Sequence, residues 1–311
     1  MLKKAAPSQQ LGRRPALSFQ PLRLEQIPLV RGHLEDWQYR TCDATIGATF
    51  MWRDYFSTEF AVEEDTLYFK TNYLDHETAF PLPLGPDRRL GYERIAAYCT
   101  GRGLPIRFCT VPVEELKILQ EVFGEARLDM HTERDWSDYL YNGADMVNFA
   151  GRRFSGQRNH MHKFEKACPN WRFEKIQSEN LAAVRDFFVA YEAQYTKASG
   201  LAREEAQKVL EVLDHYGDYG MLGGMLLSGD EIVGMSMGEI IADTLYIHIE
   251  KASRRYPGTY QMLVNQFAKA FVTPQVAYIN REEDVGDEGL RTSKLSYHPV
   301  ALLDKYTVEV R

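Results

Sequence analysis

Cysteine is scarce in this chain, and the few present do not follow a recognisable pattern. The 311 residues contain four cysteines, none of them in the CxxC spacing of a zinc or redox motif. They are Cys42, Cys99, Cys109 and Cys168. Neither a disulfide framework nor a zinc site is indicated, so we expect reduced thiols. The pair His160 and His162 has no third ligand nearby, and we predict no metal site.

Long apolar segments and an excess of positive charge are also missing. No window reaches the roughly 20 apolar residues of a membrane-spanning helix, and the N-terminus has basic residues without the apolar core of a signal peptide. The net charge of −7 argues against a protein that coats nucleic acid, but it is compatible with a local basic patch. We therefore expect a cytoplasmic protein without a transmembrane segment, and leave open a peripheral contact with a membrane.

What is present is typical of a soluble α/β protein. The hydrophobic share of 44% and the charged share of 26% are ordinary, and 311 residues favour two domains. Strands and helices recur in a similar order in both halves, which indicates two copies of one α/β fold. We expect a tail at 1–16, a first lobe at 17–150, a basic connecting segment at 151–175 and a second lobe at 176–311. In the first lobe, we expect strand pieces at 50–55 and 59–62, and the latter forms a hairpin with 67–71.

Three strands in the second half, at 220–227, 231–240 and 244–250, are separated by turns short enough for hairpins. A period of two along the third strand places Tyr246, His248 and Glu250 on one face. Buried polar side chains need partners, and an internal hydrogen-bond network would satisfy them. The functional alternative is a cleft in which His248 or Glu250 is a general base and Tyr246 donates its hydroxyl.

A turn that follows this strand is a candidate phosphate site. Arg255 precedes Gly258 by three residues, and Tyr260 opens a long amphipathic helix. Free backbone N–H groups at a helix N-terminus can bind phosphate. A turn containing Pro257 and Gly258 is also common in proteins without any ligand.

The connecting segment 151–175 carries seven basic residues against two acids, a local balance of +5 in an acidic chain. Aromatic residues alternate with the basic ones, a composition that can bind a phosphate backbone. The candidate nucleic-acid contacts are Arg152, Arg153, Arg158 and Lys163. A solvated amphipathic helix that links the two lobes is the alternative.

The stretch 276–298 combines a short apolar strand, a charged turn and a helix. Strand ends of this kind place polar groups at the edge of a sheet, where ligands bind. We predict that substrate-binding side chains converge there at the end of the strand 276–279. These candidates are Asn280, Glu283, Asp284, Arg291 and Lys294. The competing explanation is structural, because Asp284 or Glu288 would also suit capping the helix and pairing with Arg291.

Three motifs resemble a known bacterial family. They are Glu250-Lys-Ala252, Tyr256-x-Gly258-x-Tyr-Gln261, and Asn280-Arg-Glu-Glu-Asp-Val-Gly-Asp-Glu-Gly-Leu-Arg-Thr-Ser-Lys-Leu-Ser-Tyr-His-Pro299. Together they look like the phosphatidylglycerol lysyltransferase C-terminal-like family, over residues 19–310. The resemblance implies two tandem lobes of the GNAT (acetyltransferase) fold, each with a mixed sheet flanked by helices. Arg255 and Gly258 resemble the GNAT pyrophosphate loop, although Tyr260 stands where that loop usually has a small residue.

The same resemblance implies a transferase related to enzymes that move an aminoacyl group from tRNA to a lipid or peptide. The donor would be acyl-CoA or aminoacyl-tRNA, and the acceptor a small molecule or lipid head group. In that mechanism Glu283 or Asp284 holds an amino group, while Arg291 and Lys294 bind phosphate or stabilise an oxyanion. The alternatives are an acyl-CoA-dependent N-acyltransferase, or a ligand- or RNA-binding protein that has lost the chemistry.

Overall fold

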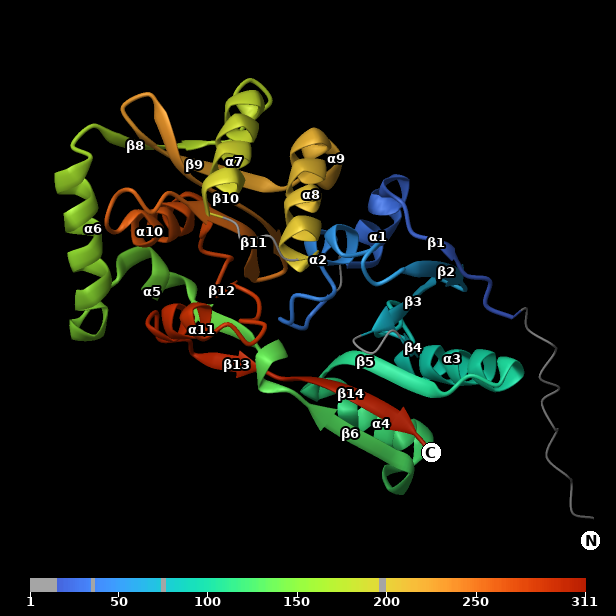
Figure 1. Ribbon diagram of the computed structural model, residues 1–311. Helices are drawn as coiled ribbons and strands as arrows, with labels where there is room; N and C mark the ends of the chain where they lie inside the picture. The colour runs from blue at the N-terminus through green and yellow to red at the C-terminus, as the bar shows by residue number, and fades with distance from the viewer. Residues whose placement is uncertain (1–15, 35–36, 74–76, 196–199) are drawn as a thin grey trace, which may run out of the picture.

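The computed structural model describes residues 16–34, 37–73, 77–195 and 200–311 of the chain (Figure 1). The expected tail at 1–16 lies outside the described residues except for its last residue, Ala16. The described residues form two lobes, each built on β-sheet with helices packed against it (Figure 1). None of the described helices combines the length and the apolar character needed to cross a membrane.

The first lobe contains two small antiparallel sheets, of order β1-β2-β3-β4 and β5-β14-β6. Their strands are β1 (Gln20–Pro21), β2 (Glu59–Glu63), β3 (Thr66–Tyr73), β4 (Glu77–Ala79), β5 (Ile106–Pro112), β6 (Leu128–Thr132) and β14 (Lys305–Val310). The turn between β2 and β3 passes through Glu64 and Asp65, whose φ angles of 47° and 60° suit a two-residue hairpin turn. The expected hairpin is confirmed.

The helices of the first lobe include one that the sequence analysis missed. The helical segments are η1 (Leu24–Gln26), α1 (Ile27–Leu34), α2 (Ile46–Met51), α3 (Arg88–Arg102), η2 (Val113–Glu115), α4 (Leu116–Phe123), η3 (Glu125–Arg127) and η4 (Arg134–Trp136). The expected strand at 50–55 is wrong, because α2 includes Phe50 and Met51. Thr45 caps this helix by accepting a hydrogen bond from the Ala48 N–H at 3.1 Å. The side chains of Ile46 and Phe50 lie on one face of the helix, and both are buried.

The second lobe is built on one seven-stranded sheet of order β13-β7-β12-β11-β10-β9-β8. Its strands are β7 (Asp138–Asn142), β8 (Trp171–Lys175), β9 (Leu222–Ser228), β10 (Glu231–Ile241), β11 (Thr244–Ala252), β12 (Tyr278–Asn280) and β13 (Ala301–Leu303). Within this sheet, β11 and β12 form the parallel pair. They pair over 244–246 and 278–280, after which β12 ends and β11 continues to Ala252. Beyond Tyr246 and Asn280 the two strands no longer pair, and side chains connect them instead, as between Glu250 and Arg281.

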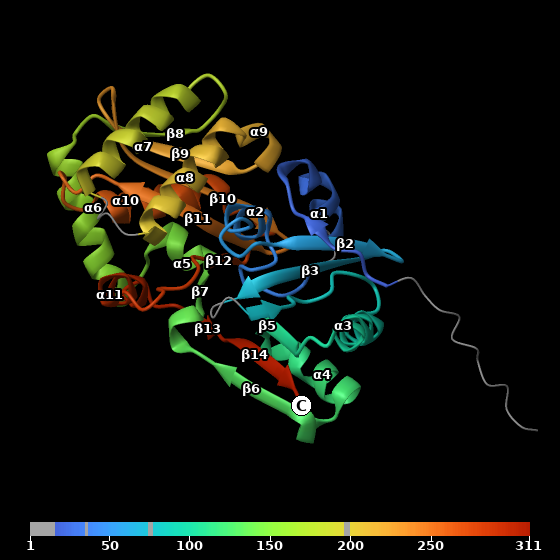
Figure 2. The ribbon, with the colours of Figure 1, turned by 45° about the vertical axis from the view of Figure 1, so that its right-hand side comes forward.

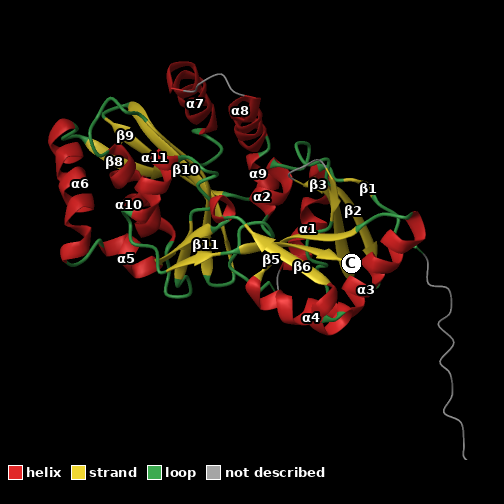
Figure 3. Cartoon of the chain, turned by 60° about the horizontal axis from the view of Figure 1, so that its bottom comes forward, coloured by secondary structure: helices red, strands yellow, loops and turns green. Residues whose placement is uncertain are grey.

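Helices cover both faces of this sheet (Figure 3). They are α5 (Gly143–Asn148), η5 (Arg152–Phe154), α6 (Ser155–Ala167), α7 (Leu181–Tyr195), α8 (Gly200–Asp214), α9 (Tyr216–Tyr219), α10 (Thr259–Phe271) and α11 (Glu288–Leu295). The α10 helix packs on α5 and α6 and on one face of β10 and β11, and α7 packs against the other face of these strands. A mixed sheet with helices on both faces agrees with the expected α/β class.

The sheets divide the chain differently from the expected lobe boundaries at 150 and 176. Strand β7 lies in the second lobe's sheet, where it pairs with β12 and β13, and β8 pairs there with β9. The last strand, β14, returns to the first lobe and lies between β5 and β6 (Figure 2). Each lobe thus contains a strand from the other half of the chain, and the sequence carries no local signal for such long-range pairing.

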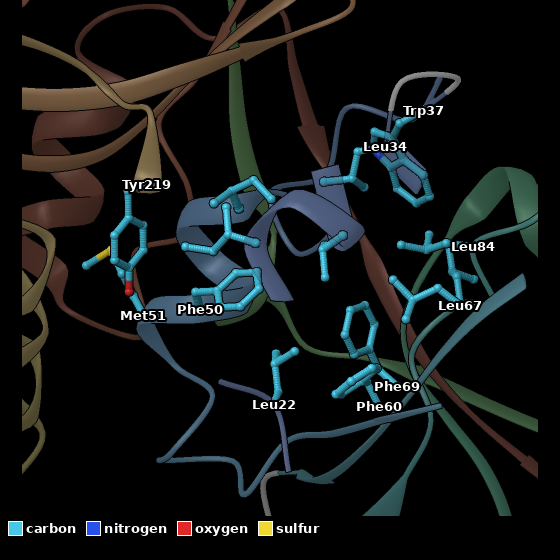
Figure 4. Close-up of a cluster of buried hydrophobic side chains, with 14 of the residues drawn as sticks. Leu22, Leu34, Trp37, Phe50, Met51, Phe60, Leu67, Phe69, Leu84 and Tyr219 are labelled. Carbon is cyan, nitrogen blue, oxygen red and sulfur yellow. The ribbon is translucent and has the colours of Figure 1, made fainter. Parts of the chain in front are cut away.

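One hydrophobic cluster joins the two lobes around α2 (Figure 4). Phe50 and Met51 of α2 lie in it with Leu22 and Phe60 of the first lobe, and Tyr219 approaches them from the second lobe (Figure 4). Met237 and Ile249 of the large sheet belong to the same cluster. This shared core fixes the position of the segment 41–47, which carries polar groups to the interface between the lobes.

Candidate functional site

A β-bulge between β10 and β11 decides which side chains of β11 share a face. Ser236 lies opposite Glu250, but Glu239 lies opposite Tyr246, which leaves His248 as an extra residue in β11. Tyr246 and Glu250 consequently point to opposite faces of the sheet. The expected alternation of Tyr246, His248 and Glu250 along one face is wrong for this reason. The Tyr246 hydroxyl donates to the Tyr39 carbonyl oxygen of the first lobe at 3.1 Å.

His248 is buried between two carboxylates. Its Nδ1 lies 2.7 Å from Oε1 of Glu282, and its Nε2 lies 2.9 Å from Oε1 of Glu239. Glu239 also accepts a hydrogen bond from the Gly47 N–H, and a Cβ at Gly47 would lie 2.3 Å from the imidazole ring. Burial alone would lower the pKa of His248, but the hydrogen bonds to both carboxylates raise it to about 10. An imidazolium that donates from both nitrogens cannot accept a proton, so the expected general-base role of His248 does not fit this environment.

We expect the charge of His248 to make stability fall with rising pH. Because its folded pKa of about 10 lies above the ordinary value near 6.5, its contribution is complete below pH 6.5 and is lost as pH rises through 10. Urea unfolding between pH 6.5 and 9.5 should show a loss of up to about 1.4 kcal/mol per pH unit. His248→Gln should remove this slope. His215→Gln, at an exposed histidine paired with Asp218, should leave it unchanged; a wild-type slope in His248→Gln would contradict the assignment.

A second buried cluster surrounds the ammonium group of Lys305, where β14 enters the first lobe. Its Nζ lies 2.8 Å from Asp138, 2.8 Å from Glu283 and 3.2 Å from Asp43. The Cys42 Sγ lies 3.7 Å from the same nitrogen. Burial would lower the pKa of Lys305, but Asp138 and the other anionic partners raise it well above its ordinary value. The cluster therefore joins segment 42–43, β7, β14 and the charged turn after β12.

The same cluster contains the residues best placed to hold a cation. Among the described residues, one potential ligand atom each of Cys42, Asp43 and Glu283 lie within 4.8 Å of one another. The Lys305 ammonium already contacts all three side chains and supplies positive charge to them. Burial raises the pKa of the Cys42 thiol, which does not favour the thiolate that a metal ion requires. Burial also raises the pKa of Asp43, to about 7.

The charged turn after β12 is fixed from within by Lys294. This buried lysine donates to the carbonyl oxygens of Arg281 at 2.5 Å and Glu282 at 3.1 Å, and also to that of Glu283. Burial lowers the pKa of Lys294. Glu282 and Val285 adopt positive φ angles of 55° and 46°, a conformation that needs support from its surroundings. Lys294 thus stabilises the backbone that carries the three consecutive acids.

Buried Asp284 and partly exposed Arg291 form an ion pair beside this turn. Asp284 accepts hydrogen bonds from the Tyr139 hydroxyl at 2.6 Å, from Arg291 at 2.7 and 3.0 Å, and from Arg134 at 3.2 Å. Burial would raise the pKa of Asp284, but these bonds hold it well below its ordinary value. Asp287, not Asp284 or Glu288, caps α11 by accepting from the Leu290 N–H.

The substrate-binding candidates lie in three adjoining places. Asn280 donates to Asp138 of the neighbouring strand β7 and to the Arg40 carbonyl oxygen of the first lobe. Glu283 contacts Lys305. Asp284 pairs with Arg291, and Lys294 holds the turn between these two places. The side chains are brought to one region, the junction of the two lobes at the end of β12.

The candidate cofactor loop lies at the N-terminus of α10. The exposed side chain of Arg255 pairs with Glu231, and the Tyr260 hydroxyl lies 3.0 Å from that of Tyr191. Gly258 has a φ of 85°, and a Cβ there would lie 1.9 Å from the carbonyl oxygen of His160 in α6. The backbone of α6 therefore packs directly against the turn, on the side where Gly258 lacks a side chain.

The basic candidates of residues 151–175 lie on η5 and α6, at the outer side of the second lobe (Figure 1). Arg152 and Lys163 are exposed. Arg153 pairs with Asp145, and Arg158 donates to the carbonyl oxygens of Phe149 and Gly151. A depression of about 140 Å³ beside α6 and α10 is lined by Arg158 and by both polar and apolar residues, among them His162 and Met161.

Several residues of the buried clusters were not identified by the sequence analysis. Glu239 carried a usable signal, because it is the one charged residue within the otherwise uncharged run 232–241, and a lone buried charge requires a partner. Cys42, Asp138 and Lys305 carried no comparable signal, since the structure brings them together from segments up to 263 residues apart.

Comparisons with known proteins agree with this architecture. A family model described as "Phosphatidylglycerol lysyltransferase, C-terminal" matches residues 35–309. An uncharacterized protein of Mycoplasmoides gallisepticum is 24% identical over 201 residues, which cover 64% of each chain, so the match spans under two thirds of that curated relative.

Two solved structures resemble the chain over most of its length. A protein of unknown function from Bacteroides thetaiotaomicron has a TM-score of 0.87 at 27% identity and covers 95% of this chain and 100% of its own. The C-terminal domain of a candidate lysylphosphatidylglycerol synthetase from Agrobacterium fabrum has a TM-score of 0.64 at 12% identity, with 92% of both chains covered. The expected α/β class, with sheets flanked by helices, is confirmed.

Proposed function

Because this chain belongs to the phosphatidylglycerol lysyltransferase C-terminal family, we propose that it transfers an activated acyl or aminoacyl group to an amine or hydroxyl acceptor. The observation that carries the proposal is the extent of the family match, which includes both lobes and the junction between them. The charged clusters at that junction supply groups suited to group transfer. An aminoacyl-tRNA donor would place the reaction in the cytoplasm.

At the junction of the lobes, we assign the role of proton acceptor to a carboxylate and an electrostatic role to a nearby ammonium group. Asp43 is our candidate base, since a carboxylate with a pKa of about 7 can accept a proton near neutral pH. The acceptor amine or hydroxyl attacks the donor carbonyl, and its proton passes to Asp43. The bond from that carbonyl to the donor oxygen breaks, and the proton is then delivered to the leaving hydroxyl. The Lys305 ammonium, 3.2 Å from Asp43, favours the ionised carboxylate before the attack.

We propose tRNA as the carrier of the donor group, and the exposed basic residues of η5 and α6 as its contact. Arg152 and Lys163 have exposed side chains, and α6 carries further basic residues along the same helix. An acyl-CoA donor is less well supported, because α6 packs against Gly258 and the Arg255 side chain is engaged by Glu231. The acceptor would be a small molecule or a lipid head group.

The donor class can be tested by binding and by transfer. tRNA charged with radiolabelled lysine should bind with an affinity that falls steeply with salt, and Arg152→Ala with Lys163→Ala should reduce the slope of log K against log salt by about 1–2. Arg102→Ala with Lys117→Ala, an exposed pair on the first lobe, should leave the slope unchanged.

The transfer arm uses vesicles that contain phosphatidylglycerol as the acceptor. Label should pass to lipid, and Asp43→Asn should slow the transfer about 10²–10⁴-fold while tRNA binding persists. Asp129→Asn, at an exposed pair with Arg311, is the control. Transfer from acetyl-CoA without tRNA binding would favour the acyl-CoA alternative. Salt-dependent tRNA binding without transfer to lipid, peptide or small amines would favour a binding protein.

A further inference from the structure

A cavity of about 170 Å³ lies at the junction of the two lobes. Its lining includes Thr41, on the segment between the lobes, and Leu140 and Leu303 of the large sheet. Leu303 lies opposite Asp138 in the register of β13 and β7, and Leu140 follows Asp138 by two residues, so all three side chains share a face of the sheet. The cavity therefore adjoins the cluster around Lys305, to which Asp138 belongs, without being lined by it.

A buried hydroxyl without a partner faces this cavity. Thr41 is 4% exposed, and its hydroxyl forms no hydrogen bond with a described residue. Nor is its oxygen one of the unpartnered atoms that the described residues enclose completely. An oxygen that is neither bonded nor enclosed faces open space, and the open space beside Thr41 is the cavity. Since buried polar groups normally have partners, this hydroxyl is available to a ligand.

The opening of the cavity carries negative charge that the protein does not compensate. Glu114 and Asp304 are the exposed acidic residues of the lining. Within the described chain Glu114 forms no ion pair, and Asp304 accepts from the neutral hydroxyl of Ser137 at 2.8 Å. Arg40, the basic residue of the lining, is engaged by Asp243 through Nε at 3.1 Å and Nη2 at 2.7 Å. A ligand group at the opening should therefore be a cation.

An organic cation suits this lining better than a metal ion. The described residues of the lining supply no third carboxylate, imidazole or thiol to join Glu114 and Asp304. Between the opening and Thr41, the wall includes the apolar side chains of Leu140 and Leu303, against which an aliphatic chain would be buried. The volume is below the roughly 300–1,000 Å³ of pockets for drug-sized ligands, so the chain must be short.

We propose that the cavity binds a short aliphatic molecule with an ammonium group at one end and a hydroxyl group at the other. The ammonium group donates to Glu114 and Asp304 at the opening, and the hydroxyl group bonds to Thr41 at the buried end. Because the ligand contacts both lobes, its binding should raise the melting temperature. The inference goes beyond the proposed function, since it concerns binding alone and requires no donor.

The ligand class can be tested by ligand-observed NMR titration. Linear amino alcohols of about three to six carbon atoms, such as 5-amino-1-pentanol, are compared with the diol and the alkylamine of the same length. At least one amino alcohol should bind wild-type protein about tenfold or more tightly than its diol, and about threefold or more tightly than its alkylamine. Equal binding of the three, or no binding of any amino alcohol up to about 10 mM, would overturn the proposal.

Variants locate the binding, because an ammonium ligand also gathers without a specific site on a chain of net charge −7. Glu114→Gln with Asp304→Asn should reduce the preference for the amino alcohol over the diol to about twofold or less. Glu125→Gln with Asp230→Asn removes the same charge from two exposed positions outside the cavity and should leave the preference unchanged. An equal loss in both double variants would show that the ligand responds to net charge alone and would refute the site.

The buried end of the site is tested by Thr41→Val, which keeps the shape of the side chain. It should abolish the preference for the amino alcohol over the alkylamine. It should not lower the melting temperature, because the hydroxyl has no described partner to lose. An unchanged preference in Thr41→Val would contradict the proposed orientation of the ligand.

The cavity and the proposed function can fail separately. Transfer from charged tRNA in a protein that does not distinguish the amino alcohol from the diol would refute the cavity site and leave the transfer function standing. Binding that depends on Glu114, Asp304 and Thr41, without transfer from any donor, would support the cavity site and refute the transfer function.

Discussion

Replacing Lys305 by methionine should lower the free energy of unfolding by about 3–5 kcal/mol, because removing one partner of a buried ion pair leaves a buried charge uncompensated. The ammonium group is almost fully buried and contacts Asp43, Asp138 and Glu283. Without it, three carboxylates remain close together at the junction of the lobes. Urea unfolding at pH 7 measures the loss, and Lys70→Met, at a more exposed pair with Glu59, should cost about 1 kcal/mol or less.

The destabilisation should depend on pH in a defined direction. Lys305 lowers the pKa of Glu283 against the effect of burial, so in the wild-type protein this carboxylate contributes stability above its ordinary pKa that is lost on acidification. In Lys305→Met, the remaining carboxylates can relieve their repulsion by taking up protons. The difference in the free energy of unfolding between the wild type and Lys305→Met should thus be largest above pH 7 and become smaller below pH 5. A loss under 1 kcal/mol at pH 7 would show that the cluster is open to water.

Local signals in the sequence were sufficient for the hairpins of the second lobe. The turns at 228–230 and 242–243 separate β9, β10 and β11, whose observed bounds differ by at most two residues from the predicted strands. These turns depend on Gly229 and on short polar connections, which are properties of adjacent residues. The reasoning succeeded where the structure is decided within about ten residues.

Long-range packing decided the features that the sequence did not predict. The bulge at Met237/Gly238 moves Tyr246 and Glu250 to opposite faces, and a Cβ at Gly238 would lie 2.0 Å from the Tyr246 carbonyl oxygen. That glycine is visible in the sequence, but its close approach to the neighbouring strand is not. Lys305 similarly acquires its role because β14 crosses back to the first lobe.

The charged turn was recognised from its composition, but the composition did not show which role each of its residues has. Glu283 and Lys294 were both assigned to substrate, whereas the structure engages Lys294 with backbone carbonyl oxygens and Glu283 with Lys305. Arg281 and Glu282, which contact the side chains on β11, were not distinguished from the rest of the run. A charge run in a sequence does not show which side of the turn each side chain takes, and that depends on the positive φ angles at Glu282 and Val285.

Replacing Asp284 by asparagine should lower the melting temperature of the unliganded protein and reduce the free energy of unfolding by about 3 kcal/mol. The side chain is fully buried, and its two oxygens accept from Tyr139, Arg291, Arg134 and the Gly286 N–H. In asparagine, an NH₂ group would replace one of the two acceptor oxygens. Its N–H groups would then face some of these N–H and O–H donors. The loss in the free energy of unfolding should be present at pH 7. It should become smaller as pH falls below the ordinary pKa of an aspartate, because the pKa of Asp284 in the folded protein is held well below that value.

The matched control for Asp284→Asn is the same substitution three residues later. Asp287 is exposed and caps α11 through the Leu290 N–H, and asparagine is an equally good cap, so Asp287→Asn should change stability by about 0.5 kcal/mol or less. If Asp284 is a scaffold for the turn, charged tRNA should raise the melting temperature of Asp284→Asn by as much as it raises that of the wild type. A variant with unchanged unliganded stability and no ligand shift would instead place Asp284 in direct contact with the substrate. The five hydrogen bonds that this carboxylate already accepts, from four residues, leave it no free acceptor position, which is why we expect the loss of stability.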